Sequence, residues 1–131
     1  MRVLLDTHIW LWALLEPERL DTPTARRLDR ADSELWLSPI SVWEAHLLAE
    51  RGRLELDRPP AMWLDDALRR VPLRDAPVTR EIAIRSREVG LDHDDPADRF
   101  LAATAAVYDL VLLTADDRLR QGTGYRVFGG R

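Results

Sequence analysis

Apolar residues along the chain gather into short runs that predict the strands of a sheet. The runs "RVLLD" (2–6) and "LVLLT" (110–114) show no alternation of apolar and polar positions, which is typical of strands buried on both faces of a parallel sheet. The run "ELWLS" (34–38) predicts a third strand, and "RVPL" (70–73) and "YRVF" (125–128) are weaker candidates. The pattern therefore predicts a mainly parallel sheet.

Helical segments fill the intervals between these strands. They are expected at 7–15, 22–31, 38–52, 60–70, 79–90 and 95–109. Three of them open on a capping residue followed by proline, with Thr22, Ser38 and Asp95 as the expected N-caps. Gly52 and Gly90 are the expected stop signals of the helices at 38–52 and 79–90. Strands that alternate with helices predict an α/β fold, a three-layer α/β/α domain with a central mainly parallel sheet, and we expect one domain over residues 1–131.

Four acidic residues fall where this architecture places binding sites. Asp6 ends the first strand, and Asp116 follows the strand 110–114 closely. Glu44 and Asp98 lie in early turns of their helices, on the stripe of apolar residues that should face the core. In open α/β sheets, sites form beyond the carboxyl ends of the strands. We therefore expect all four carboxylates to meet at one edge of the sheet.

Buried carboxylates need a compensating charge or hydrogen-bond donors. The chain contains no lysine, and all 19 basic residues are arginine, so a divalent cation is the simplest partner for four acids. Oxygen-rich sites suit Mg²⁺ or Mn²⁺ rather than zinc. Each acid also has a local alternative: Asp6 as a helix cap, Glu44 in a capping box with Ser41, Asp98 in one with Asp95, and Asp116 at the start of a turn.

Composition narrows the class of protein. The chain has 131 residues, a formal net charge of −4 and no cysteine, which excludes disulfides, zinc thiolates and thiol nucleophiles. The negative charge argues against binding nucleic acid by bulk electrostatics. No segment reads as a signal peptide or is long enough to span a membrane, so we expect a cytoplasmic protein.

The motifs together resemble a known family. "LLDTHIWLW", "LSPISVWEAHLLAERGRLEL" and "DPADRFLAATAAVYDLVLLTADDRL" are similar to those of PIN-domain ribonucleases, and among these to the VapC-type toxins of type II toxin–antitoxin pairs. The resemblance covers nearly the whole chain. It implies an endoribonuclease dependent on Mg²⁺ or Mn²⁺, a homodimer, an RNA substrate, and a small VapB-like antitoxin that covers the acidic groove.

The resemblance also implies roles for individual residues. The catalytic and metal-binding acids would be Asp6, Glu44, Asp98 and Asp116, although Asp117 leaves an ambiguity of one residue. The supporting residues would be Thr7, Thr114 and Asp95, and the candidates for RNA or antitoxin contacts are Arg99, Arg118, Arg120 and His8. His93 is a weaker candidate in the acidic loop. Trp10, Trp36 and Trp43 are expected in the core, whereas Trp12 and Trp63 are expected at contact surfaces.

Two other classes of function remain open. A phosphatase or a DNA-cleaving nuclease would use a similar acidic site, although "DTH" lacks the second aspartate of an aspartyl phosphatase. A catalytically silent PIN-like binding module would use its acids only for a partner or a structural metal. The presence of all four acids favours the ribonuclease.

Overall fold

The structure, a computed structural model, describes residues 1–129 and contains one five-stranded sheet. The strands are β1 (Arg2–Leu5), β2 (Glu34–Leu37), β3 (Arg74–Asp75), β4 (Val111–Leu113) and β5 (Arg126–Val127). They lie in the order β3-β2-β1-β4-β5, and every neighbouring pair is parallel. The two apolar runs that predicted buried strands thus form the adjacent central strands β1 and β4.

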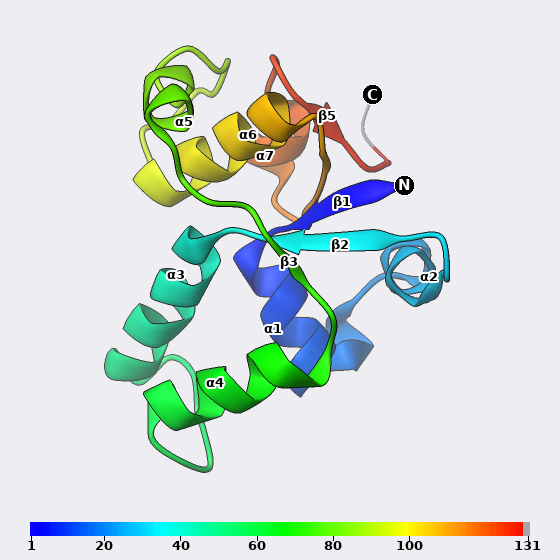
Figure 1. The fold of residues 1–131 in the computed structure, drawn as a ribbon, viewed down its shortest axis with the longest axis vertical. Helices are drawn as coiled ribbons and strands as arrows, with labels where there is room; N and C mark the ends of the chain where they lie inside the picture. Colours follow the sequence, from blue (N-terminus) through cyan, green and yellow to red (C-terminus); the bar gives the residue numbers. More distant parts are fainter. Residues whose placement is uncertain (130–131) are drawn as a thin grey trace.

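Helices connect the strands and cover both faces of the sheet (Figure 1). They are α1 (Thr7–Leu15), α2 (Thr22–Asp29), α3 (Pro39–Glu50), α4 (Pro60–Arg70), α5 (Arg80–Arg85), α6 (Pro96–Tyr108) and α7 (Asp117–Gln121), with a short 3₁₀ helix over Pro17–Arg19. Within residues 1–129, none of the helices has the length and apolar character needed to cross a membrane.

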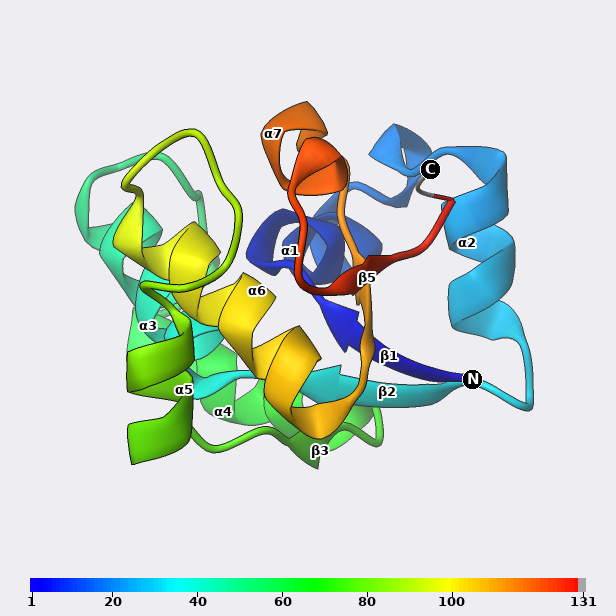
Figure 2. The same ribbon diagram turned by 90° about the horizontal axis from the view of Figure 1, so that it is seen from above.

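Each face of the sheet carries its own apolar core. Leu4 and Leu112 point toward α5, α6 and α7, whereas their neighbours Leu5 and Leu113 point toward α1, α3 and α4. This alternation follows from the pleat of a strand, in which successive side chains face opposite sides. Figure 2 shows α1 and α6 close to the arrowhead of β1. The predicted three-layer α/β/α fold is confirmed, and its layers converge at the carboxyl edge of β1 and β4.

Several boundaries differ from the sequence-based expectation. The strand expected at 70–73 is wrong, because α4 continues to Arg70 and β3 begins at Arg74. The N-cap of α2 is Asp21 rather than Thr22, since the Asp21 carboxylate accepts a hydrogen bond from the amide of Thr24 at 2.8 Å. The segment expected to be helical over 79–90 forms the shorter helix α5 and then turns.

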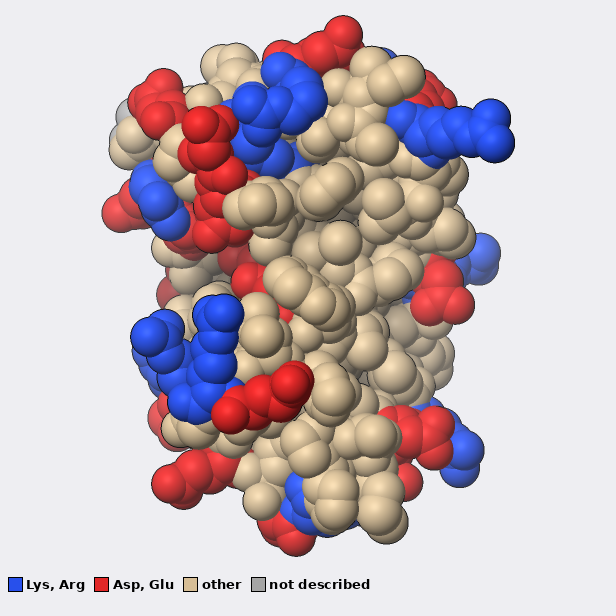
Figure 3. All heavy atoms as spheres, turned by 90° about the vertical axis from the view of Figure 1, so that its left-hand side faces the viewer, with Lys and Arg blue, Asp and Glu red and all other residues tan. Residues whose placement is uncertain are grey.

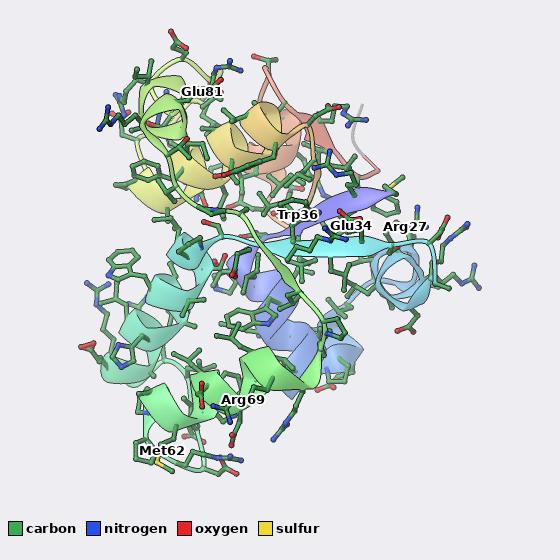
Figure 4. All side chains as sticks on the ribbon, viewed as in Figure 1. Arg27, Glu34, Trp36, Met62, Arg69 and Glu81 are labelled. Atoms are coloured by element: carbon green, nitrogen blue, oxygen red, sulfur yellow. The ribbon has the colours of Figure 1, made fainter. Side chains whose placement is uncertain are left out.

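The tryptophans divide differently from the prediction. Trp10 is buried and Trp36 packs against Tyr108 beneath α6, with 5.8 Å between the ring centroids (Figure 4). Trp43 is 57% exposed, so its assignment to the core was wrong. Trp63 of α4 is buried in the core, so the expectation that it lies at a contact surface was also wrong. On α3 the buried residues are Ser41 and Ala45, which leaves Trp43 on the outer side of the helix.

Candidate active site

Asp6 lies at the end of β1, directly beside the end of β4. Leu5 pairs with Leu113 in the parallel register, and the amide of Asp6 donates to the carbonyl of Leu113 at 3.0 Å. The hydroxyl of Thr114 then donates to the Asp6 carboxylate at 2.6 Å. Asp6 occupies the N-cap position of α1, but its side chain accepts no capping hydrogen bond. The Asp6 carboxylate is therefore directed across the sheet edge, and the helix-cap alternative is wrong.

Glu44 reaches the same edge from α3. The hydroxyl of Thr7 donates to Oε1 of Glu44 at 2.5 Å and lies 2.8 Å from the hydroxyl of Ser41. The N-cap of α3 is Ser38, whose side chain accepts from the amide of Ile40 at 3.1 Å. A capping box between Ser41 and Glu44 is therefore excluded. Both residues instead form a short polar chain with Thr7 at the start of α1.

Asp98 is held at the start of α6 by a histidine. Asp95 caps this helix by accepting from the amide of Asp98 at 3.2 Å. Nε2 of His93 lies 2.9 Å from Oδ2 of Asp98, and both side chains are largely buried, with 15% and 13% exposure. His93 was only a weak candidate from the sequence, and the structure makes it a direct neighbour of the acid.

Arg99 supports this arrangement from inside the protein. Its guanidinium donates to the carbonyls of Ser86, Val89, Leu91 and His93 at 2.9–3.3 Å, and the residue is 7% exposed. The prediction that Arg99 contacts RNA or an antitoxin is therefore wrong, because its donors are buried and engaged. Arg99 instead fastens the segment 86–93 to α6, and this places His93 beside Asp98.

Asp116 and Arg118 form the outer end of the site. Oδ1 of Asp116 accepts from the amide of Arg118 at 2.8 Å and so caps α7. The guanidinium of Arg118 lies 3.4 Å from Asp116 and 3.9 Å from Asp98, with its side chain 59% exposed. Asp117 begins α7 and is exposed. Arg120 turns away, donating to the carbonyl of Thr114 and pairing with Asp21.

The four acids form one electrostatic group. Burial raises the pKa of Asp6 to about 6, and the charges of Asp98 and Glu44 add to this rise against the hydrogen bond from Thr114. Burial also raises the pKa of Glu44 and of Asp98, and in both the neighbouring acids contribute. For Asp116, burial is opposed by hydrogen bonds and charge from Arg118, which hold its pKa below the usual value. Repulsion thus links residues from four distant segments.

The four carboxylates are the type of ligand that a hard divalent cation prefers. Four carboxylates converge, three of them with raised pKa, and Arg118 is the arginine that pairs with two of them. Such oxygen donors suit Mg²⁺ or Mn²⁺. Within residues 1–129, no three histidine, aspartate or glutamate side chains already surround a common cation position. A bound ion would therefore draw these side chains together.

Comparison with known proteins identifies the family. A sequence profile described as "PIN domain" matches residues 3–124. The chain belongs to the PIN-domain family. Ribonuclease VapC22 of Mycobacterium tuberculosis (strain ATCC 25618 / H37Rv) is 36% identical over 121 residues, which are 90% of this chain and 89% of that protein. The predicted resemblance to PIN-domain proteins of the VapC type is confirmed.

Solved structures share the fold of this PIN domain. VapBC2 from Rickettsia felis, bound to a DNA fragment from their promoter, superposes with a TM-score of 0.71 at 16% identity, covering 97% of each chain. DNA-bound VapBC from Salmonella typhimurium gives a TM-score of 0.68 at 18% identity, covering 97% of this chain and 96% of that one. At these identities the likeness establishes the architecture.

Proposed function

We propose that this PIN domain is a VapC-type endoribonuclease toxin that hydrolyses RNA phosphodiester bonds with Mg²⁺ or Mn²⁺. The observation that carries the proposal is the convergence of Asp6, Glu44, Asp98 and Asp116 from four segments onto one edge of the sheet, where burial, with a smaller contribution from mutual repulsion, raises the pKa of Asp6, Glu44 and Asp98. The 36% identity to a protein named Ribonuclease VapC22 supports the choice of reaction.

The four acids would hold the metal, and the residues around them would fix their orientation. A bound divalent cation activates water at neutral pH and stabilises charge on the phosphoryl oxygens. Thr114 donates to Asp6 and Thr7 donates to Glu44, and His93 lies at hydrogen-bond distance from Asp98. These contacts fix the orientation of each carboxylate in the absence of substrate, so less reorganisation is needed on binding.

Arg118 is the residue we propose for contact with the RNA backbone. It is exposed and already lies beside Asp98 and Asp116, so a cation that neutralises these acids would release its guanidinium toward a phosphate. Arginine binds phosphate oxygens through paired N–H donors. The exposed His8 follows Asp6 closely in sequence and lowers the pKa of both Asp6 and Glu44 by its charge, which supports a role for His8 at the edge of the site.

Cleavage of end-labelled single-stranded RNA tests this reaction. We expect cleavage with Mg²⁺, none with EDTA, and products with 5′-phosphate and 3′-hydroxyl ends, because attack by water does not use the 2′-hydroxyl. Asp98→Asn should abolish cleavage, whereas Asp92→Asn, which changes an exposed acid of the same loop, should not. Cleavage in EDTA, products ending in a 2′,3′-cyclic phosphate, or full activity of Asp98→Asn would each rule out the mechanism.

The same assay separates the rival functions. A DNA nuclease would cleave a deoxyribonucleotide strand of the same sequence at least as well as the RNA. A phosphatase would release inorganic phosphate from an end-labelled strand without shortening it. A silent binding module would show no turnover with either metal, while still binding its partner.

The partner that we propose is a small VapB-like antitoxin. Structural relatives were solved as VapBC complexes, and the four acids would favour an arginine from an antitoxin tail through charge-assisted hydrogen bonds. A neighbouring short reading frame whose product suppresses cleavage would support this assignment. Its genomic absence, or a product without effect on cleavage, would contradict it. A cytoplasmic location belongs to the same proposal.

A homodimer is also part of the proposal, and one face of the molecule suits it. Figure 3 shows a broad band free of charged side chains on the side that carries α3 and α5. Trp43 on α3 and Ile84 on α5 are 57% and 65% exposed, and exposed apolar patches of this kind are typical of interfaces. We expect Ile84→Asp to convert a dimer to a monomer in light scattering. A wild-type protein that is already monomeric would contradict the dimer.

A further inference from the structure

A hollow lies beside the acidic site, between α1 and the end of α3 together with the residues that follow it. Its volume is about 260 Å³, and it is lined by His8, Leu11, Trp12, Leu15, Glu16, Arg19, Leu48, Arg53 and Leu54. Four of these residues, at positions 8, 11, 12 and 15, recur at the three-and-four spacing of one helix face. That face of α1 extends over about 10 Å away from the catalytic edge.

The hollow lies next to the acidic site, with His8 between them. This residue lines it, and its charge also lowers the pKa of Asp6 and Glu44. α1 and α3, which form its walls, pack against each other below the sheet (Figure 1). A polymer whose phosphodiester bond lies at the carboxylates therefore meets this hollow next.

The wall chemistry is that of a nucleotide site. The rings of His8 and Trp12 lie 5.9 Å apart at 54°, and the guanidinium of Arg19 stacks over Trp12 at 4.4 Å. Unstacked RNA bases bind to aromatic rings and to guanidinium planes. Arg53 is exposed, and within residues 1–129 it forms no ion pair with an acid, so its charge is available to a phosphate.

We infer that this hollow, the α1–α3 pocket, binds the base of an RNA nucleotide adjacent to the cleaved bond. The base stacks on the Trp12–Arg19 pair, while Arg53 binds the neighbouring phosphate. The apolar wall formed by Leu11, Leu15, Leu48 and Leu54 offers few hydrogen-bond partners, so the pocket selects an unstacked base rather than one particular base. This inference rests on the proposed cleavage of RNA and names the part of the substrate that the protein grips.

Stacking on an aromatic side chain contributes roughly 1–3 kcal/mol per base. We therefore expect Trp12→Ala to lower kcat/KM by about 5–150-fold, chiefly through KM, and Trp12→Phe to restore most of the loss. Arg53→Ala should raise KM several-fold, whereas Arg51→Ala, an exposed arginine of the same segment, should not. Because Trp12 also packs against the core, melting temperatures must be measured, and the surface variant Arg53→Ala keeps the test valid if Trp12→Ala unfolds.

Abasic substitution identifies the base directly. An oligoribonucleotide spanning a mapped cleavage site is prepared with one abasic nucleotide at each successive position. For the wild type, one position next to the cleaved bond should show the 5–150-fold loss, and Trp12→Ala should show no further loss there. An abasic penalty of equal size in Trp12→Ala, or wild-type kinetics of both Trp12→Ala and Arg53→Ala, overturns the inference.

Binding in EDTA separates this inference from the proposed reaction. Fluorescence anisotropy with labelled single-stranded RNA measures affinity without turnover, so it remains informative if the wild type cleaves no RNA. Weaker binding of Trp12→Ala and Arg53→Ala supports the pocket even then, and unchanged binding overturns it. Variants that bind and cleave RNA normally but escape suppression by an antitoxin would assign the pocket to that protein partner, which also overturns the inference.

Discussion

Asp6 and Asp116 follow neighbouring strands of one sheet, yet their carboxylates lie in opposite surroundings. Asp6 is buried, accepts one hydrogen bond from Thr114, and has its pKa raised to about 6. Asp116 lies at the surface, caps α7 and pairs with Arg118, and its pKa lies below the usual value. Asp6, at the inner end of the site, is thus a buried carboxylate held by a neutral hydroxyl, whereas Asp116, at the outer end, is already paired with an arginine.

This difference indicates where a cation gains most. A divalent ion would offset the desolvation and the mutual repulsion of Asp6, Glu44 and Asp98. At Asp116 it would compete with a helix amide and an arginine for the carboxylate. Without a bound metal, the buried acids at the inner end therefore destabilise the folded protein. Proteins commonly hold such destabilising groups at functional sites.

Cleavage should show the largest contrast between the two ends. We expect Asp6→Asn to lower kcat by about 100–1,000-fold, since it removes a desolvated metal ligand. Asp116→Asn should lower it by only about tenfold, roughly 1.4 kcal/mol, because this carboxylate is partly screened and Asp117 lies beside it. Single-turnover rates at saturating Mg²⁺ measure both. Equal losses for the two variants would contradict the distinction, and Asp117→Asn is the matched control.

Stability should change in the opposite direction. A carboxyl whose pKa is raised in the folded state binds more protons there than in the unfolded chain, so stability falls as pH rises from about 4 to about 6. Asp6→Asn removes this penalty and should stabilise the protein by about 2–3 kcal/mol at pH 7.5, and by almost nothing near pH 4. Denaturant unfolding at both pH values measures it. A gain that is equal at the two pH values would show that ionisation of Asp6 is not its cause.

Metal binding should stabilise the wild type in the way that Asp6→Asn does without metal. Binding to the folded state alone stabilises by RT ln(1 + [L]/Kd), about 1.4 kcal/mol when Mg²⁺ is at ten times its dissociation constant. We expect this increase in wild-type unfolding free energy at pH 7.5, measured without RNA, and a much smaller increase in Asp6→Asn. Na⁺ at equal ionic strength is the control. An equal effect of Na⁺ would indicate simple screening.

The sequence predicted the four acids because their positions follow from local rules. Asp6 and Asp116 come after apolar strands, and Glu44 and Asp98 lie on helical stripes, so parallel topology alone brings them to one edge. The structure gives a different answer for each local alternative. The side chain of Asp6 does not cap a helix. The side chain of Asp116 caps α7 and also shares Arg118 with Asp98. Their role in catalysis stays a proposal.

The contacts of Thr7 and Thr114 join residues that the sequence had already grouped with the acids. Those of His93 and Arg99 were harder to predict, because they depend on how a turn folds back. Nothing local shows that the segment 86–93 returns to place His93 on Asp98. The burial of Arg99 did leave a signal, since it shares a helical stripe with Ala102 and Ala103, both fully buried. An arginine on an apolar stripe needs acceptors, and here four backbone carbonyls provide them. The exposure of Trp43 likewise follows from its position opposite Ser41 and Ala45.

The smallest effect concerns the cap formed by Asp116. Replacing an N-cap aspartate by alanine removes one hydrogen bond to a helix amide and typically destabilises by about 1 kcal/mol, whereas asparagine caps nearly as well. We therefore expect Asp116→Ala to lower the unfolding free energy at pH 7.5 by about 1 kcal/mol and Asp116→Asn to change it little. Denaturant titrations of the two variants, set beside Asp6→Asn, then give a loss at the outer end and a gain at the inner end. If Asp116→Ala instead raised the unfolding free energy, the outer carboxylate would also destabilise the folded protein. The two ends of the site would then not differ in their effect on stability.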